Sequence, residues 1–361
     1  MPFRDTVKEN LWFALVSYEY ERHVRDLLLK GLKEGWLDWS EKAGETPEQK
    51  EQYLKDQATP FICLSIRQSK ELFTAAEQAS DATKPLLSYY GMMNLAKGLM
   101  GVDAPDYFQD KDNLWHGISI KPGDKYTFKF SEECVVLHPR GIYSLGRKSV
   151  GLPEICAANE TVVVRIADIF KGLPELYWDY MKIGNVQPQE MNTFPFGVPE
   201  RQFNHYSQQF YVDTFIIQDL YERVKNRLPV DLGEAFVMDP PAAGSIHLKS
   251  KLTTANIQEL VTLLDGFSTM LMTSNARFIP LKFACVVQAA GDAHRNEDLA
   301  FTELELLYIL TFYMSTLARY RPHIWDAAIS GRETEFVTVF KKFLYYADSK
   351  FIALIANRVR G

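Results

Sequence analysis

The stretch that decides the fold is residues 84–117, KPLLSYYGMMNLAKGLMGVDAPDYFQDKDNLWHG. Its first part predicts a helix, because apolar residues recur at helical spacing up to the glycine at 101. At about 100° per residue, Tyr90, Asn94 and Lys97 share one narrow face, while apolar side chains surround them. A helix that is apolar nearly all round is normally buried, so its polar groups need partners. The loop that follows ends in a His-Gly pair at 116–117.

Composition indicates a soluble globular protein. The 361 residues suit one large domain or a few small ones, with 47% hydrophobic and 24% charged residues. The net charge of −6 provides no overall basic field of the kind that attracts nucleic acid. Residues 319–361 nevertheless contain eight Lys or Arg against four Asp or Glu. Either a local basic face or an ordinary solvated helix surface explains that excess.

The cysteine spacing and the length of the apolar segments bear on whether the protein binds a metal and where it is located. Cys63, Cys134, Cys156 and Cys285 are scattered, with no CxxC pair. Because a zinc site needs clustered ligands, we expect reduced thiols, no metal and no other cofactor. The amino terminus lacks the apolar core of a signal peptide, and the apolar run at 306–318 is too short to cross a bilayer. We therefore expect a cytoplasmic protein without a membrane partner.

Periodicity divides the chain into three regions: a helical region at 1–117, a mixed region at 118–250 and a second helical region at 251–361 that packs back on the first. We expect short strands at 118–120, 126–130 and 134–137, with a turn at 122–124. The segments 162–170, 207–228 and 278–287 fit either a strand or a helix. The predicted fold class is α+β, predominantly α-helical, with a small antiparallel β insertion. Helices are expected over 5–33, 60–79, 84–101, 174–181, 254–272, 302–320 and 332–358.

Three segments carry a resemblance to a known family. They are YYGMMNLAKGLM at 89–100, the His-Gly pair at 116–117 and ARYRPHIW at 318–325. In this order they resemble the YaaC-like family, which has a YYG-x-x-N-L-x-K helix, a His-Gly pair and a later helix that ends in R-Y-x-P-x-x-W. The resemblance spans most of the chain.

A looser similarity links the tyrosine helix and the His-Gly loop to the HEPN superfamily of helical domains. That similarity implies a HEPN-like helical core and a protein that acts on RNA or nucleotides. Many such domains are metal-independent ribonucleases of toxin or anti-phage defence systems, in which a histidine acts on the 2′-hydroxyl or leaving group and an arginine stabilises the phosphorane. Others only bind a nucleotide or a partner protein, and such sites often form across a homodimer interface.

The candidate site residues come from the polar stripe of the 84–101 helix and from the HEPN similarity. The catalytic candidates are His116, Arg319 and His323, and the binding candidates are Tyr90, Asn94, Lys97, Lys111 and Arg321. The spacing departs from the nuclease pattern, because three residues separate the arginine at 319 from the histidine at 323, one fewer than expected. The 111–116 segment has the expected spacing, but lysine replaces arginine and lacks its bidentate fork.

Each candidate also has a structural interpretation. The histidine at 116 could bond to the backbone while Gly117 forms an unusual turn. The stripe on the 84–101 helix could secure packing, and the basic residues at 319–323 could face the negative end of a helix. Trp325 fits a core anchor better than a stacking platform. The alternative function is therefore a non-catalytic interaction or scaffold subunit with a HEPN-like fold. GxSxG, HExxH and GxGxxG motifs are absent.

Overall fold

The computed structural model describes residues 12–39, 45–122, 127–149, 160–185, 193–195, 200–204, 209–217, 236–242, 245–250, 268–272, 278–288, 298–332 and 334–360. The helices are η1 (Val16–Glu19), α2 (Glu21–Glu34), α3 (Pro47–Tyr53), η2 (Leu54–Ala58), α4 (Thr59–Gln78), α5 (Lys84–Asp103), η3 (Tyr107–Gln109), η4 (Lys111–Leu114), α6 (Ile142–Ser149), α7 (Ile166–Phe170), η5 (Pro174–Leu176), α8 (Tyr177–Gly184), α12 (Glu303–Tyr320), α13 (Pro322–Ser330) and α14 (Val337–Arg360). The strands are β1 (Ile118–Lys121), β2 (Cys134–Leu137), β3 (Val162–Arg165), β4 (Thr193–Pro195), β5 (Glu200–Asn204), β6 (Gln209–Ile217), β7 (Phe236–Ala242), β8 (Ser245–Ser250), β9 (Ser268–Met272), β10 (Phe278–Gln288) and β11 (Asp298–Phe301).

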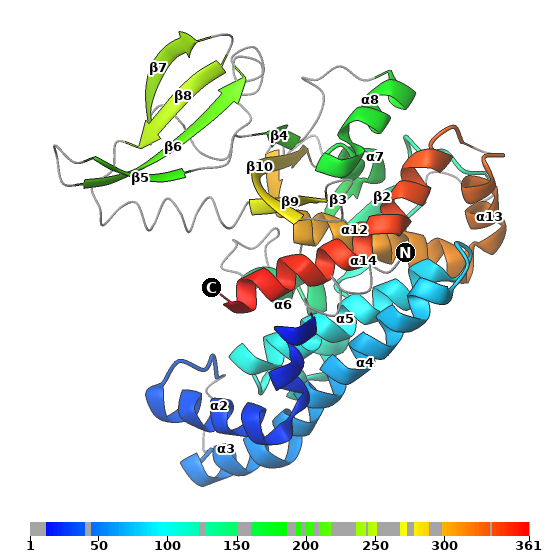
Figure 1. The fold of residues 1–361 in the computed structure, drawn as a ribbon. Helices are drawn as coiled ribbons and strands as arrows, with labels where there is room; N and C mark the ends of the chain where they lie inside the picture. The colour runs from blue at the N-terminus through cyan, green and yellow to red at the C-terminus, as the bar shows by residue number, and fades with distance from the viewer. Residues whose placement is uncertain are drawn as a thin grey trace.

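The helical core is built on the α4–α5 hairpin. Figure 1 shows these two long helices side by side, with α2 and α3 near one end; α14 lies in front of α12 in this view, and both contact α5. Two glycines let the hairpin helices approach closely. A Cβ atom at Gly98 would lie 2.6 Å from Ile66 Cδ1, and one at Gly91 would lie 3.2 Å from the Phe73 ring. The glycines of the YYG helix therefore serve helix packing.

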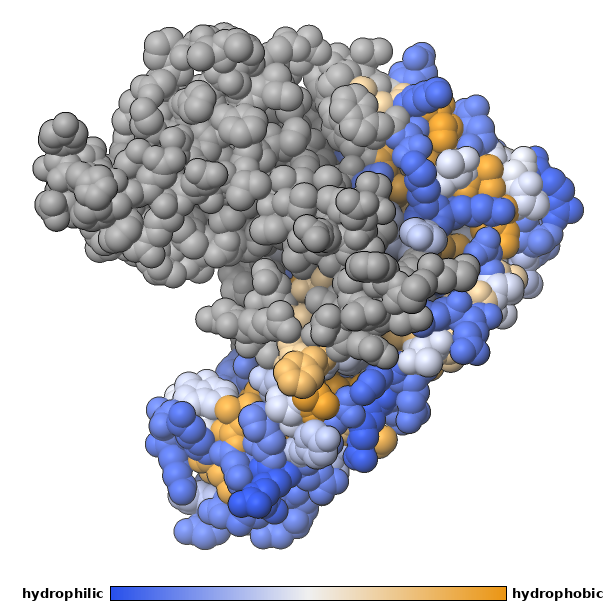
Figure 2. Space-filling view, viewed as in Figure 1, coloured by the Kyte–Doolittle hydropathy of each residue, from blue (hydrophilic) through white to orange (hydrophobic). Residues whose placement is uncertain are grey.

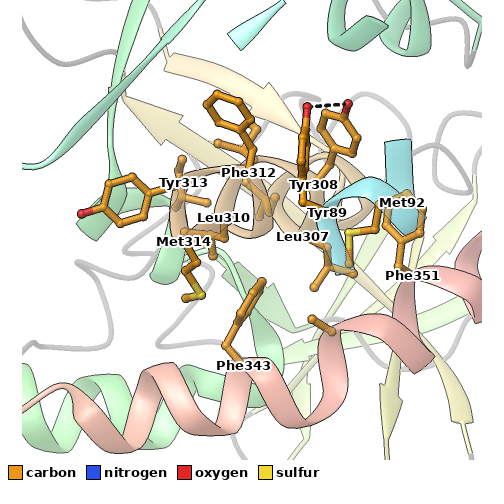
Figure 3. Packing of buried hydrophobic residues seen from close by; sticks show 14 of the residues in the cluster. Tyr89, Met92, Leu307, Tyr308, Leu310, Phe312, Tyr313, Met314, Phe343 and Phe351 are labelled. Carbon is orange, nitrogen blue, oxygen red and sulfur yellow. Dashed lines mark hydrogen bonds between the residues drawn. The ribbon is translucent and has the colours of Figure 1, made fainter. Parts of the chain in front are cut away.

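The α12 helix is the centre of the core. Thr302 and Glu305 form a capping box at its first turn, which satisfies backbone donors that would otherwise lack partners. Nearly every side chain from there to Leu317 is buried, as expected for a helix that packs on all sides. Figure 3 shows this packing, in which α12 contributes Leu307, Tyr308, Phe312 and Met314 and faces Phe343 of α14. Figure 2 shows hydrophilic residues over much of the outer surface of the α2–α4 end.

The described residues contain three small antiparallel sheets besides the helices. The first has the order β1-β2-β3, with Ile118 opposite Leu137 and Leu137 opposite Val162. The second has the order β11-β10-β4 with β9 also paired to β10, and the third has the order β5-β6-β8-β7. The fold is therefore predominantly α-helical α+β. In the part of the chain that the structure describes, no helix is long and apolar enough to cross a membrane.

The structure corrects several predicted boundaries. The expected helix at 5–33 is interrupted at Tyr20, whose backbone is extended; it ends in the left-handed Gly35, and residues 1–11 lie outside the described part. Residues 127–130 form no strand, and most of the predicted turn at 122–124 lies outside the described residues. Residues 254–267 of the expected helix at 254–272 lie outside the described part, and its last residues, 268–272, are instead strand β9 paired with β10. The ambiguous segments contain strands β6 and β10, and the segment at 162–170 holds a strand followed by a helix.

A buried ion group ties α14 to the rest of the core. Lys350 is fully buried and forms ion pairs with Glu175 and Glu303. Burial, together with the charge of Glu175, raises the pKa of Glu303 well above its usual range, while Lys350 opposes the rise. A single cation thus compensates two carboxyl groups inside the protein, which makes its removal costly.

Candidate functional site

The loop that carries His116 is held by two glycines with positive φ. Gly117 has φ +72° and Gly141 has φ +103°, a backbone region that favours glycine. Their backbones lie so close that a Cβ atom on Gly141 would lie 2.6 Å from the Gly117 nitrogen. The N–H of Ile142 donates to the Trp115 carbonyl at 2.7 Å, and that of Tyr143 donates to the His116 carbonyl at 3.2 Å. The first turn of α6 therefore fixes the backbone at the His-Gly pair.

The side chain of His116 joins a buried row of hydroxyl groups. Its Nδ1 lies 2.6 Å from the Tyr89 hydroxyl, which lies 3.4 Å from the Tyr308 hydroxyl. Figure 3 shows the two tyrosines side by side, with Phe312 close by on α12. The imidazole also packs against Phe312, with ring centroids 5.7 Å apart. Burial raises the pKa of Tyr89 well above its usual range, so this phenol stays protonated. His116 is thus oriented by a partner that keeps its hydrogen.

Two cations lie close enough to affect His116. Burial lowers the pKa of His116, and the charges of Arg319 and Lys97 lower it further. Arg319 donates from Nη1 to the Tyr90 hydroxyl at 2.9 Å and lies over the Tyr90 ring. Burial also lowers the pKa of Lys97. Among the described residues, no carboxylate forms an ion pair with either cation. We call His116, Lys97 and Arg319 the cation–imidazole cluster.

Exposed aromatic residues flank the cluster in sequence. Trp115, next to His116, is 72% exposed, and Tyr320, next to Arg319, is 71% exposed. The Arg319 guanidinium lies 5.0 Å from the centroid of the Tyr320 ring. Large aromatic side chains that remain in solvent beside cations are suited to stacking on planar groups such as nucleobases. Sequence reasoning overlooked both residues, although an exposed Trp beside the His-Gly pair was a usable signal.

The other predicted site residues lie in different surroundings. Asn94 donates weakly to Gln68 of α4 at 3.5 Å, so it bridges the hairpin helices. Arg321 is buried and contacts both Glu133 carboxylate oxygens at 3.4 Å. His323 is exposed in the first turn of α13. The side chain of Lys111 lies outside the described residues.

The ARYRPHIW segment therefore separates into residues that point in different directions. Pro322 ends α12 and begins α13, which changes the direction of the chain between Arg319 and His323. Trp325 is 2% exposed and donates from Nε1 to the Asp81 carbonyl at 3.0 Å, so it anchors α13 in the core. Arg319 donates to Tyr90 of α5, so the ARYRPHIW segment contacts the YYGMMNLAKGLM segment at this point.

Tyr89 is a third residue of this site, besides Trp115 and Tyr320, that the sequence did not single out. Helical spacing predicts Tyr90 on the polar stripe but not Tyr89, whose partners come from a loop and from α12. Its fully buried hydroxyl could have been suspected only from the need of every buried polar group for a partner.

The described residues contain no group of three or more His, Cys, Asp or Glu side chains that could hold a metal ion. Cys63 and Cys134 are free thiols, and burial raises the pKa of Cys63 to about 11. In comparisons with known proteins, the family model described as YaaC-like Protein matches residues 30–359. No curated protein and no solved structure matches the chain.

Proposed function

The chain belongs to the YaaC-like family, as its motifs predict, and we propose that it binds single-stranded RNA at the cation–imidazole cluster and cleaves it without a metal. One observation supports this most directly. Arg319 and Lys97 both act on His116, and no carboxylate among the described residues neutralises them. A partly buried pair of cations without a counter-ion favours an anion, and a phosphodiester is the anion that RNA presents.

The protonation state of His116 suits a general base. Its lowered pKa keeps the imidazole neutral at neutral pH. In the tautomer that donates from Nδ1 to the Tyr89 oxygen, Nε2 carries the free lone pair. In the proposed reaction, Nε2 takes the 2′-hydroxyl proton, and the 2′-oxygen bonds to phosphorus. The bond to the 5′-oxygen then breaks, that oxygen takes a proton from water, and the His116 imidazolium returns its proton to solvent. The products are a 2′,3′-cyclic phosphate and a free 5′-hydroxyl.

The two cations would serve the same reaction in different ways. The Arg319 guanidinium is planar and can offer paired N–H donors to phosphate oxygens, although one donor already bonds to Tyr90. Lys97 supplies a second positive charge near the developing phosphorane. Trp115 and Tyr320 would stack on the flanking bases. The setting that goes with this proposal, from the HEPN resemblance, is a bacterial toxin or anti-phage defence system.

A cleavage assay tests the proposal. Labelled single-stranded RNA is incubated with the protein in the presence of a chelator, and products are separated by length and end group. Wild type should produce cyclic-phosphate ends, and His116→Asn should slow cleavage by about 10²–10⁴-fold, as for loss of a general base. His23→Asn, at an exposed histidine of α2, is the matched control and should behave as wild type.

The same assay separates this proposal from its alternatives. His323→Asn should leave the rate unchanged, because His323 lies in solvent on α13. Arg319→Met should weaken RNA binding and make it less dependent on salt. The slope of the logarithm of the binding constant against the logarithm of the salt concentration should become shallower by about 0.7, the value for one lost phosphate contact on a single strand. Arg22→Met, at an exposed arginine of α2, is its control. RNA that stays intact with wild type and His116→Asn alike would refute the nuclease and favour a binding or scaffold subunit.

A further inference from the structure

A cavity of about 400 Å³ lies among α5, α6, α12 and α14, apart from the residues of the cation–imidazole cluster. This volume is within the range of sites that hold small organic ligands. Most of its lining is apolar and includes Ala96, Leu99, Ile142, Leu304, Phe351 and Ile355. An apolar group of modest size would therefore lose contact with water along the part of its surface that these side chains cover.

The polar groups of the inner wall already satisfy one another. Glu305 Oε1 accepts from the Tyr143 hydroxyl at 2.9 Å and from Arg147 Nη1 at 2.6 Å. Its Oε2 accepts from the backbone and side chain of Thr302 at 2.8 and 3.0 Å. Both oxygens of Glu305 are thus occupied, and the Arg147–Glu305 pair is neutral as a unit. These residues therefore have no net charge that a charged ligand would neutralise.

Asp103 gives the cavity its remaining charge. It ends α5, lines the cavity and is exposed to solvent, and no ion pair to it occurs among the described residues. Desolvation by the surrounding side chains raises the pKa of its carboxyl. Burial raises the pKa of Tyr18 on the same lining, and the charge of Asp103 adds to that rise. A cation placed beside Asp103 would stabilise its ionised carboxylate and offset the charge that it exerts on Tyr18.

We propose that this cavity binds a small ligand with a flat apolar body and one protonated amine, with the body among the apolar side chains and the amine beside Asp103. The apolar lining and the single uncompensated carboxylate select this chemistry together. The inference stands independently of the RNA proposal. It has one structural link to it, because Tyr308 lines the cavity and its hydroxyl lies 3.4 Å from that of Tyr89.

Three naphthalene probes of similar shape and different charge test the proposal: 1-naphthylmethylamine, 1-naphthalenemethanol and 1-naphthoate. Their binding to the full chain is measured by calorimetry and by probe anisotropy. The amine should bind tightest, by about threefold to fivefold over the alcohol, as for one solvent-exposed ion pair. The carboxylate should bind weakest.

Variants locate the binding. Asp103→Asn should remove the preference for the amine and keep alcohol binding, while Glu71→Gln, at an exposed carboxylate of α4, should change neither. Ala96→Phe should fill the cavity and abolish binding of all three probes. Leu304→Trp fills it from α12 and replaces Ala96→Phe if that variant has lost its helical circular dichroism. Absence of amine binding, equal binding of amine and carboxylate, or unchanged binding in a folded filled variant would overturn the proposal.

Discussion

Alanine at position 117 would test whether the His-Gly loop depends on backbone geometry. The chain offers a matched control at Gly35, which ends α2. The two glycines have nearly the same φ, +72° at Gly117 and +74° at Gly35. Their surroundings differ, because a Cβ atom at Gly35 would meet nothing within 4 Å, whereas at Gly117 it would lie 2.9 Å from the Arg140 carbonyl oxygen. The pair therefore separates backbone strain from steric overlap.

The magnitude follows from these distances. A left-handed alanine costs about 1 kcal/mol of unfolding free energy after the smaller entropy of its unfolded state is counted. Gly35→Ala should show that cost alone. Relief of the overlap at Gly117 requires the loop to move away from α6, which weakens the bonds from Ile142 to Trp115 and from His138 to the Gly117 carbonyl. At about 1 kcal/mol for each bond, Gly117→Ala should lose about 3 kcal/mol in total.

Urea unfolding followed by circular dichroism and tryptophan fluorescence measures both variants. We expect equal slopes and a midpoint for Gly117→Ala well below that for Gly35→Ala. Because the strained loop carries His116, any RNA cleavage should fall in Gly117→Ala and persist in Gly35→Ala. A difference below about 0.5 kcal/mol between the variants would refute the argument, since that is the usual effect of a surface substitution.

Two further predictions concern buried charge. Lys350→Met leaves Glu175 and Glu303 without their cation and should lower the free energy of unfolding, measured by chemical denaturation, by about 3–5 kcal/mol. The control Lys341→Met, at an exposed lysine of the same helix, should change it little. Equal denaturation midpoints for the two variants would contradict the buried ion group. The pKa of His116 is lower in the folded protein than its ordinary value of 6.5, so the unfolded chain binds the extra proton first and stability falls as pH drops below about 6.5. His116→Asn should remove that component of the pH dependence, and an unchanged profile would show that His116 does not titrate in this way.

Local sequence signals predicted the helical core well. Turn residues, Pro at first turns and the helical spacing of apolar residues located α4, α5 and α12, and Thr302 marked the start of α12. The capping box and the burial of almost the whole of α12 explain why these signals were sufficient. Such features depend on neighbours within one or two turns of helix, which a single sequence displays.

Non-local pairing was harder to predict. Residues 268–272 were expected to be helical but form strand β9, because they pair with β10. In short apolar segments such tertiary pairing outweighs the local preference for helix or strand. The contact between Tyr89 and His116 joins a helix to a distant loop, and the break at Pro322 sends Arg319 and Arg321 to different partners. The sequence motifs therefore indicated where the cluster lies but not which of their residues meet.

The central claim is that a phosphate group binds beside His116, and a histidine titration by NMR tests it most directly. The chain has seven histidines, and His116→Asn identifies the resonance of interest. In the free protein its pKa should lie below 6.5. Saturation with a 2′-O-methyl oligoribonucleotide, which cannot be cleaved, should raise that pKa because the phosphate offsets the charges of Arg319 and Lys97. Arg319→Met should weaken the oligonucleotide affinity. A pKa of His116 that stays the same with the oligonucleotide bound would contradict the claim.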